Sequence, residues 1–171
     1  QQLLSTPYFR AYTSRDVVGV ELGGALKNVI AIASGMVTGL QLGYNAQSAL
    51  INRGIVEISR VGKKKGAEPL TFLGLAGTGD LILTCTGPLS RNRRVGVLLG
   101  EGKKLEDIQR ELGGVAEGVY TAKSAMDFRT TLGVHMPITE QIYKILYEGK
   151  SAKQAVSDLM SRDLKSEWDA E

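Results

Sequence analysis

Apolar residues recur at intervals of three and four along most of the chain, which is the spacing of one face of an α-helix. Residues 22–44 form one long apolar segment, and residues 45–65 continue with an amphipathic pattern. Three consecutive lysines and Gly66 end this second segment, and cations before a glycine are typical of a helix C-terminus. The pattern therefore predicts two long helices, one after the other.

Shorter periodic segments, separated by glycine or proline, fill the rest of the chain. Pro69 and Pro137 lie where they suit the first turn of a helix, and Gly133 and Gly149 follow expected helix ends. Residues 151–154 have the form of a capping box. We therefore expect further helices near 70, over 90–100, 105–112, 117–132 and 137–147, and from 151 onward, and an apolar run at 81–83 between the first two of these.

The first twenty residues have a different pattern. Residues 8–13 and 17–21 alternate in polarity or carry β-branched side chains, and residues 14–16 separate them. This pattern predicts two short strands, which a hairpin would join. Because two strands alone are only marginally stable in water, they would belong at the edge of a sheet that this chain does not contain.

The expected fold is a mainly α domain of about eight helices with a short strand pair at its N-terminus. We divide the chain into remnant edge strands at 1–20, a helical domain at 21–160 and a charged, frayed tail at 161–171. The chain starts abruptly, without an initiator Met, so we expect that an upstream part is missing. Its 171 residues are enough for one such domain with a real core.

The overall composition is that of a soluble protein and narrows the function classes. Apolar residues make up 43% and charged residues 23% of the chain, and the net charge of +3 is too small to argue for nucleic acid or a membrane. The most apolar stretch, residues 29–44, is shorter than a membrane span, which favours a buried helix and a cytoplasmic protein. Because Cys85 and His135 are single residues of their kinds, we expect no internal disulfide and no zinc site.

Lys27 is isolated on an otherwise uncharged helix. Between Val17 and Asn52 the only charged residues are Glu21 and Lys27. The ammonium either reaches solvent past the core or is held in a site, and both interpretations stay open at this point. A lysine held in a site loses part of its hydration, which suits it to proton transfer.

Two glycine patterns are interpreted as structural. Gly35, Gly39 and Gly43 share one helix face and would let another helix approach closely. Residues 74–80 read GLAGTGD, which matches only the first half of a dinucleotide fingerprint, so we reject this turn as a pyrophosphate site. Asp80 is interpreted as the N-cap of the next helix, and the alternative is a carboxylate that orients a neighbouring lysine or a substrate hydroxyl.

A basic cluster, Ser90-Arg91-Asn92-Arg93-Arg94, opens the helix expected over 90–100. The backbone N–H groups and the dipole of a helix N-terminus favour an anion, and arginine binds phosphate through two parallel hydrogen bonds. A solvated charged face is the simpler interpretation of such a cluster taken alone. The cluster is therefore a candidate phosphate site that needs support from its surroundings.

Four sequence blocks, taken in order, resemble one family. Residues 19–33 read GVELGGALKNVIAIA, residues 74–81 read GLAGTGDL, residues 90–92 read SRN and residues 115–118 read VAEG. Their order and spacing resemble the C-terminal domain of the bacterial type of NAD(P)-dependent glycerol-3-phosphate dehydrogenase. The first block is the most specific of the four, since it is long and unusual.

The resemblance implies an all-helical domain similar to the C-terminal domains of 6-phosphogluconate dehydrogenase relatives. It also implies an oxidoreductase that interconverts glycerol 3-phosphate and dihydroxyacetone phosphate with NAD or NADP, and so supplies glycerol 3-phosphate for phospholipid synthesis. Lys27 would be the catalytic proton acceptor. The implied substrate contacts are Lys27, Asp80, Ser90, Arg91 and Asn92, and the implied cofactor contacts are Arg91, Val115 and Glu117. Asn28 and Thr84 are expected near the site.

The chain departs from the family in one large respect, because it has no Gly-x-Gly-x-x-Gly dinucleotide domain. We therefore expect the main cofactor-binding domain to lie outside this chain, and the chain alone not to catalyse hydride transfer. Two alternatives remain, a non-catalytic helical assembly module and a sister dehydrogenase for another phosphorylated hydroxy compound. No metal, nucleic acid or membrane span is expected, and a homodimer is compatible with the sequence.

Overall fold

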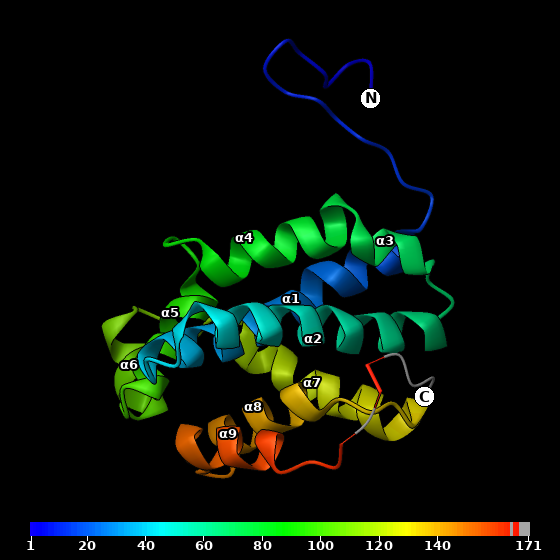
Figure 1. Ribbon diagram of the computed structural model, residues 1–171. Coiled ribbons are helices and arrows are strands. Elements are labelled where there is room, and N and C mark those ends of the chain that lie inside the picture. Colours follow the sequence, from blue (N-terminus) through cyan, green and yellow to red (C-terminus); the bar gives the residue numbers. More distant parts are fainter. Residues whose placement is uncertain (165, 168–171) are drawn as a thin grey trace.

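In the computed structural model, which describes residues 1–164, 166 and 167, nine α-helices and one π-helical turn follow one another (Figure 1). The predicted mainly α fold is confirmed. The elements are α1 (Val17–Gly39), α2 (Gly43–Lys64), α3 (Pro69–Leu73), the π-helical turn η1 (Leu75–Gly79), α4 (Asp80–Thr86), α5 (Arg91–Gly100), α6 (Leu105–Glu111), α7 (Glu117–Leu132), α8 (Pro137–Tyr147) and α9 (Ala152–Met160).

Helix α1 is the centre of the fold. Every residue from Asn28 to Val37 is buried, and helices α2, α4, α5, α7 and α8 all pack against it. A helix that is apolar all round is stable only when other elements surround it. By length and composition α1 would also suit a membrane span, but 56% of its most apolar window is buried inside the protein, as in a core helix.

The predicted strand pair is wrong. Residues 17–21 form the start of α1, because the Asp16 carboxylate caps that helix by accepting a hydrogen bond from the Gly19 N–H (2.8 Å). This cap outweighs the β-branched side chains of Val17, Val18 and Val20, which favoured a strand only locally. Within residues 1–16, β-type pairing is limited to one isolated bridge between Thr6 and Phe9. This segment extends away from the helices (Figure 1).

The predicted helical run over 22–44 is interrupted. Helix α1 ends at Gly39, and the chain turns at Gln41 and Gly43, whose φ angles of 57° and 86° lie in the left-handed region. A positive φ suits glycine, so the turn explains Gly43. The prediction that Gly43 shares one helix face with Gly35 and Gly39 is therefore wrong, and a Cβ at Gly43 would meet nothing within 4 Å.

The predicted close helix approach is confirmed at the other two glycines. A Cβ at Gly35 would lie 2.0 Å from the carbonyl oxygen of Arg93, and a Cβ at Gly39 would lie 2.2 Å from that of Val97. Helix α5 contributes Gly96 to the same crossing, where a Cβ would lie 1.9 Å from the carbonyl oxygen of Ile32. The two backbones touch, which fixes α5 against the C-terminal half of α1.

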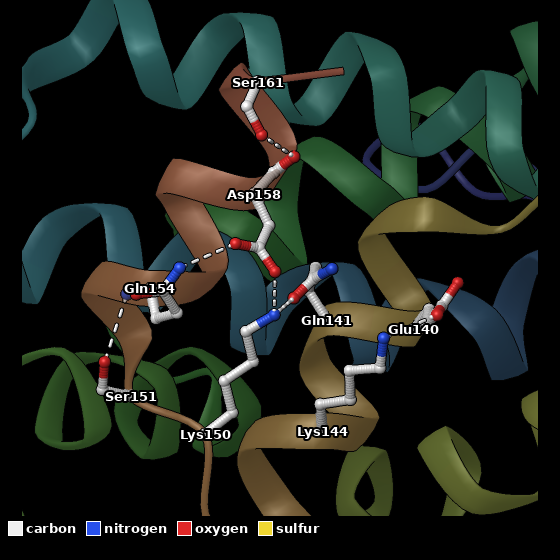
Figure 2. A network of polar contacts seen from close by, with 8 residues as sticks. All are labelled: Glu140, Gln141, Lys144, Lys150, Ser151, Gln154, Asp158 and Ser161. Carbon is white, nitrogen blue, oxygen red and sulfur yellow. Dashed lines mark hydrogen bonds and ion pairs between the residues drawn. The ribbon is translucent and has the colours of Figure 1, made fainter. Parts of the chain in front are cut away.

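The C-terminal helices are joined by a polar network, shown in Figure 2. The Lys150 ammonium pairs with the Asp158 carboxylate of α9 and donates to Oε1 of Gln141 in α8 (2.5 Å). Ser151 caps α9 by accepting from the Gln154 N–H (3.1 Å), as the capping box predicts. The predicted frayed tail at 161–171 lies partly outside the described residues.

A buried carboxylate joins α2 to α8. Glu57 is 1% exposed, and its two oxygens accept hydrogen bonds from the backbone N–H groups of Ile138 and Thr139, each at 2.9 Å. These N–H groups begin α8 and have no partner within their own helix. Burial raises the pKa of Glu57, although the hydrogen bonds from Thr139 and Ile138 and the charge of Arg60 oppose that shift.

Candidate functional site

The side chains of Lys27 and Asp80 form an ion pair between α1 and α4. They are 53 residues apart in the sequence, and their side chains are 21% and 35% exposed. The lysine therefore neither reaches freely into solvent nor is sealed in the core. The pair is accessible to a small molecule, and it places an ammonium at a fixed point beside α1.

The glycine-rich turn places Asp80 against α1. A Cβ at Gly23 would lie 2.8 Å from the carbonyl oxygen of Ala76, so α1 and η1 touch at a position where only glycine fits. The predicted N-cap role of Asp80 is wrong: Gly79 occupies the cap position, and Asp80 is the first residue of α4. Its carboxylate is directed at Lys27 instead, which matches the alternative of a lysine-orienting group.

Thr84 holds the same aspartate from one turn further along α4. Its hydroxyl donates to the Asp80 carbonyl oxygen (2.6 Å) and lies 3.4 Å from Asp80 Oδ1. The Lys27 ammonium contacts the other carboxylate oxygen, Oδ2. Thr84 thus lies beside the pair, as predicted, and its part there is to orient Asp80.

A buried chain of amides lies next to Lys27. Asn92 of α5 donates through Nδ2 to Oδ1 of Asn28 (2.9 Å), and its own Oδ1 accepts from the Gly118 N–H (2.9 Å). Asn28 and Asn92 are 6% and 8% exposed. Because an amide nitrogen carries two hydrogens, Asn92 has one further N–H besides its bond to Asn28, while its side chain joins α1, α5 and α7.

The basic cluster opens α5, as predicted. Ser90 is the N-cap, and its hydroxyl oxygen accepts from the Arg93 N–H (3.2 Å). Arg91 is exposed and donates through Nη2 to the carbonyl oxygen of Leu112 (3.0 Å). Arg94 instead turns to α6, where it lies 3.5 Å from the Glu111 carboxylate. Among the cluster's arginines, Arg91 is the exposed one without a carboxylate partner in the described part of the chain.

Of the residues predicted to contact a cofactor, Arg91 lies against the segment that leads to the other two: a Cβ at Gly114 would lie 3.7 Å from Arg91 Nη2. The Arg91 guanidinium lies against the segment after α6, where Val115 is half-buried, and Glu117 is the exposed first residue of α7. A Cβ at Gly118 would lie 2.6 Å from the carbonyl oxygen of Asn28, so the start of α7 touches α1 beside Lys27. The predicted site residues of α5 and α7 are thus linked to α1 through Asn28, the sequence neighbour of Lys27.

The structure adds residues that the sequence did not single out. Gly23 and Gly118 carry no functional group, yet each allows a backbone contact that brings a site element against α1. In the sequence, these two glycines stood out only as members of the family blocks at residues 19–33 and 115–118. A further feature is Arg93 Nε, which is buried without a hydrogen-bond partner among the described residues.

Cys85 and His135, which could suggest thiol or imidazole chemistry, are not part of the Lys27–Asp80 pair or of the basic cluster. Cys85 is buried, and burial raises the pKa of its thiol to about 12, so it is not a nucleophile. His135 is exposed in the loop before α8. Among the described residues, no group of three or more His, Cys, Asp and Glu side chains is placed to hold a metal ion.

Comparison with known proteins gives one consistent result. A family profile described as the C-terminus of NAD-dependent glycerol-3-phosphate dehydrogenase matches residues 16–157. Glycerol-3-phosphate dehydrogenase (NAD(P)+) of Geobacter sulfurreducens is 60% identical over 167 residues, which cover 98% of this chain and 50% of that protein. The enzyme of the same name from Myxococcus xanthus is 59% identical, with the same coverage.

Solved structures agree with these sequence matches. The crystal structure of glycerol-3-phosphate dehydrogenase from Coxiella burnetii has a TM-score of 0.90 and 43% identity, over 94% of this chain and 50% of that one. The structure of glycerol-3-phosphate dehydrogenase from Saccharomyces cerevisiae has a TM-score of 0.84 and 34% identity, over 94% and 47%. The chain thus spans about half the length of the relatives it matches.

Proposed function

Since this chain belongs to the family defined by the C-terminal part of NAD-dependent glycerol-3-phosphate dehydrogenases, we propose that it is the substrate-binding half of such an enzyme. The reaction would interconvert glycerol 3-phosphate and dihydroxyacetone phosphate with NAD or NADP. The observation that carries the proposal is the partly exposed Lys27–Asp80 pair, together with the hydrogen bond from Asn92, at the basic start of α5, to Asn28, the neighbour of Lys27.

Lys27 is the proposed proton acceptor in the oxidation of glycerol 3-phosphate. Loss of a hydride from a secondary alcohol requires a base at the hydroxyl, and reduction of the ketone requires a donor at the same place. The amine of Lys27 can serve both directions, since it alternates between a neutral and a charged form. Asp80 and Thr84 support this role by holding the nitrogen in position.

The start of α5 is the proposed phosphate site. Helix α5 has 10 residues, and its N-terminal dipole and backbone N–H groups favour a negative charge. The exposed guanidinium of Arg91 can bind phosphate oxygens through two hydrogen bonds, and the remaining N–H of Asn92 can add a third. A phosphate held there would fix the reacting carbon beside Lys27.

A nicotinamide cofactor fits the surface only in part. When bound, NAD or NADP supplies the hydride acceptor or donor of the reaction. The exposed Arg91 and Glu117 and the half-buried Val115 could contact it, but the described part of the chain contains no sheet that could hold a dinucleotide. We therefore assign the main cofactor-binding site to a second half of the protein, and expect no hydride transfer by this chain alone.

The proposal is tested by NADH- and NADPH-dependent reduction in the full-length protein. Dihydroxyacetone phosphate should be reduced, whereas dihydroxyacetone, which lacks the phosphate, should be reduced far more slowly. Equal rates with the two ketones would favour a sister dehydrogenase with another substrate. If neither ketone is reduced, the proposal is contradicted, and the alternative of a non-catalytic helical assembly module is favoured.

A further inference from the structure

A strongly basic cavity lies at another part of the fold. Its volume is about 630 Å³, within the range of small-molecule sites. It opens where the C-terminal end of α2 meets the end of α7 and the loop to α8. It is lined by Arg60, Lys63 and Lys64 of α2, by Arg129 of α7 and by Gly133, Val134 and His135.

The charge of this cavity is of one sign. Four of its lining residues are lysine or arginine, and no carboxylate lines it within the described part of the chain. The net charge of the whole chain is only +3, so positive charge is concentrated here. Like charges that converge on one cavity repel one another, and an anion bound between them relieves that repulsion.

The position of Lys63 and Lys64 in the last turn of α2 explains only part of this arrangement. Cations at a helix C-terminus interact favourably with the helix dipole. That effect does not require Arg60, one turn earlier on the same face, or Arg129, which comes from another helix. The convergence of two helices' cations on one hollow is a property of the tertiary fold.

The two arginines of the cavity are engaged by other groups of the protein, whereas the two lysines are not paired with a carboxylate among the described residues. Arg129 lies 3.2 Å from the Glu140 carboxylate, and Arg60 donates to the carbonyl oxygen of His135 (3.4 Å). Lys63 and Lys64 are exposed and form no ion pair with any described residue. The two lysines are therefore available to an external anion, while the two arginines frame the cavity.

We propose that this cavity binds a small phosphate-bearing anion of high charge, of the diphosphate class. Several cations around a cavity of this size suit a ligand with more than one charged group, and a single carboxylate would leave most of them unused. None of the residues that line the cavity belongs to the surface around Lys27 and Asp80. The site is thus an addition to the substrate-binding function proposed above.

The test titrates inorganic pyrophosphate into the full chain at low ionic strength and follows the backbone amide signals by NMR. The amides of Gly133 and His135 should shift. In the double variant Lys63→Gln/Lys64→Gln, binding should weaken by about tenfold or more. The matched control is Lys123→Gln/Lys153→Gln, which removes the same charge from exposed positions outside the cavity, and its affinity should stay within about twofold.

Three results would overturn the proposal. One is the absence of binding up to about 10 mM pyrophosphate, since such an affinity is too weak for a built site. Another is a set of shifts confined to the amides of Ser90 and Arg91, which would place the anion at the start of α5 instead. The third is equal weakening in both double variants, which would show that only the overall charge of the chain attracts the anion.

Discussion

The side chains of Asn28 and Asn92, 64 residues apart in the sequence, meet in a buried hydrogen bond of 2.9 Å. The Gly118 N–H completes the arrangement by donating to Asn92. Three helices thus meet at two amides, immediately beside Lys27. Asn92, which is proposed to contact the substrate, thus also holds the three helices of the site together.

Substitution of Asn28 by alanine is expected to destabilise the chain. It leaves the buried Nδ2 of Asn92 without its acceptor, and an unsatisfied buried donor costs about 1–3 kcal/mol. The free energy of unfolding in urea measures the loss. Asn52→Ala is the matched control, because Asn52 is exposed on α2 and should change stability by less than about 0.5 kcal/mol. A similar loss of unfolding free energy in the two variants would refute a structural role for the Asn28–Asn92 hydrogen bond.

Gly96→Ala tests the crossing of α1 and α5. The new Cβ would lie 1.9 Å from the carbonyl oxygen of Ile32, so the helices must separate, at a cost of about 3 kcal/mol or more. Gly24→Ala is the control, because a Cβ there meets nothing within 4 Å and alanine favours a helix. Thermal unfolding should show a large loss for the first variant and none for the second. An unchanged midpoint for Gly96→Ala would contradict the close contact.

Glu57 predicts a particular pH dependence of stability. Its pKa is higher in the folded chain than its ordinary value of 4.5, chiefly because it is buried. The folded chain therefore holds this proton more tightly, and the resulting stability is complete below about pH 4.5 and is lost as the pH rises through the folded pKa.

Glu57→Gln isolates this contribution, because glutamine does not titrate. The free energy of unfolding of the unaltered chain minus that of the variant should be largest near pH 4.5 and should fall as the pH rises. Urea unfolding at a series of pH values measures the difference. A constant difference would mean that the hydrogen bonds from the α8 backbone cancel the effect of burial, and a difference that grows with pH would mean that they outweigh it; either result would contradict the prediction.

Arg91→Ala tests the phosphate site in the full-length protein. Loss of a charge-assisted hydrogen bond should raise the KM for dihydroxyacetone phosphate by about ten- to a hundredfold, with a smaller effect on kcat. Arg94→Ala removes an arginine of the same cluster that faces Glu111, and should leave KM nearly unchanged. Equal effects of the two substitutions would show that the cluster acts through its overall charge.

The helical class of the fold could be predicted because its signal is periodic and local. The same local reasoning failed at residues 17–21, where β-branched side chains suggested a strand. A cap at Asp16 decides that region, and its second carboxylate oxygen accepts from the Glu68 N–H, a partner 52 residues away. Likewise, the turn at Gln41 is not visible in hydrophobic periodicity, because both sides of it are apolar.

The candidate site depends even more on contacts between distant segments, which local sequence patterns do not show. Spacing marked Lys27 as unusual but could not show what it faces, and it favoured a cap for Asp80, whose partner is 53 residues away. The Asn28–Asn92 hydrogen bond is likewise a contact between distant segments. The family resemblance predicted that Lys27, Asp80 and Asn92 serve one site, because it carries information on tertiary contacts that hydrophobic periodicity lacks.

The central claim is that Lys27 transfers the proton. The most direct measurement is kcat for dihydroxyacetone phosphate reduction by the full-length protein with Lys27→Ala, together with its unfolding midpoint and Lys123→Ala as a control. The account predicts a loss of roughly 10²–10⁴-fold in turnover, an intact fold, and partial recovery when methylamine replaces the missing amine. Turnover near that of the unaltered protein would contradict it.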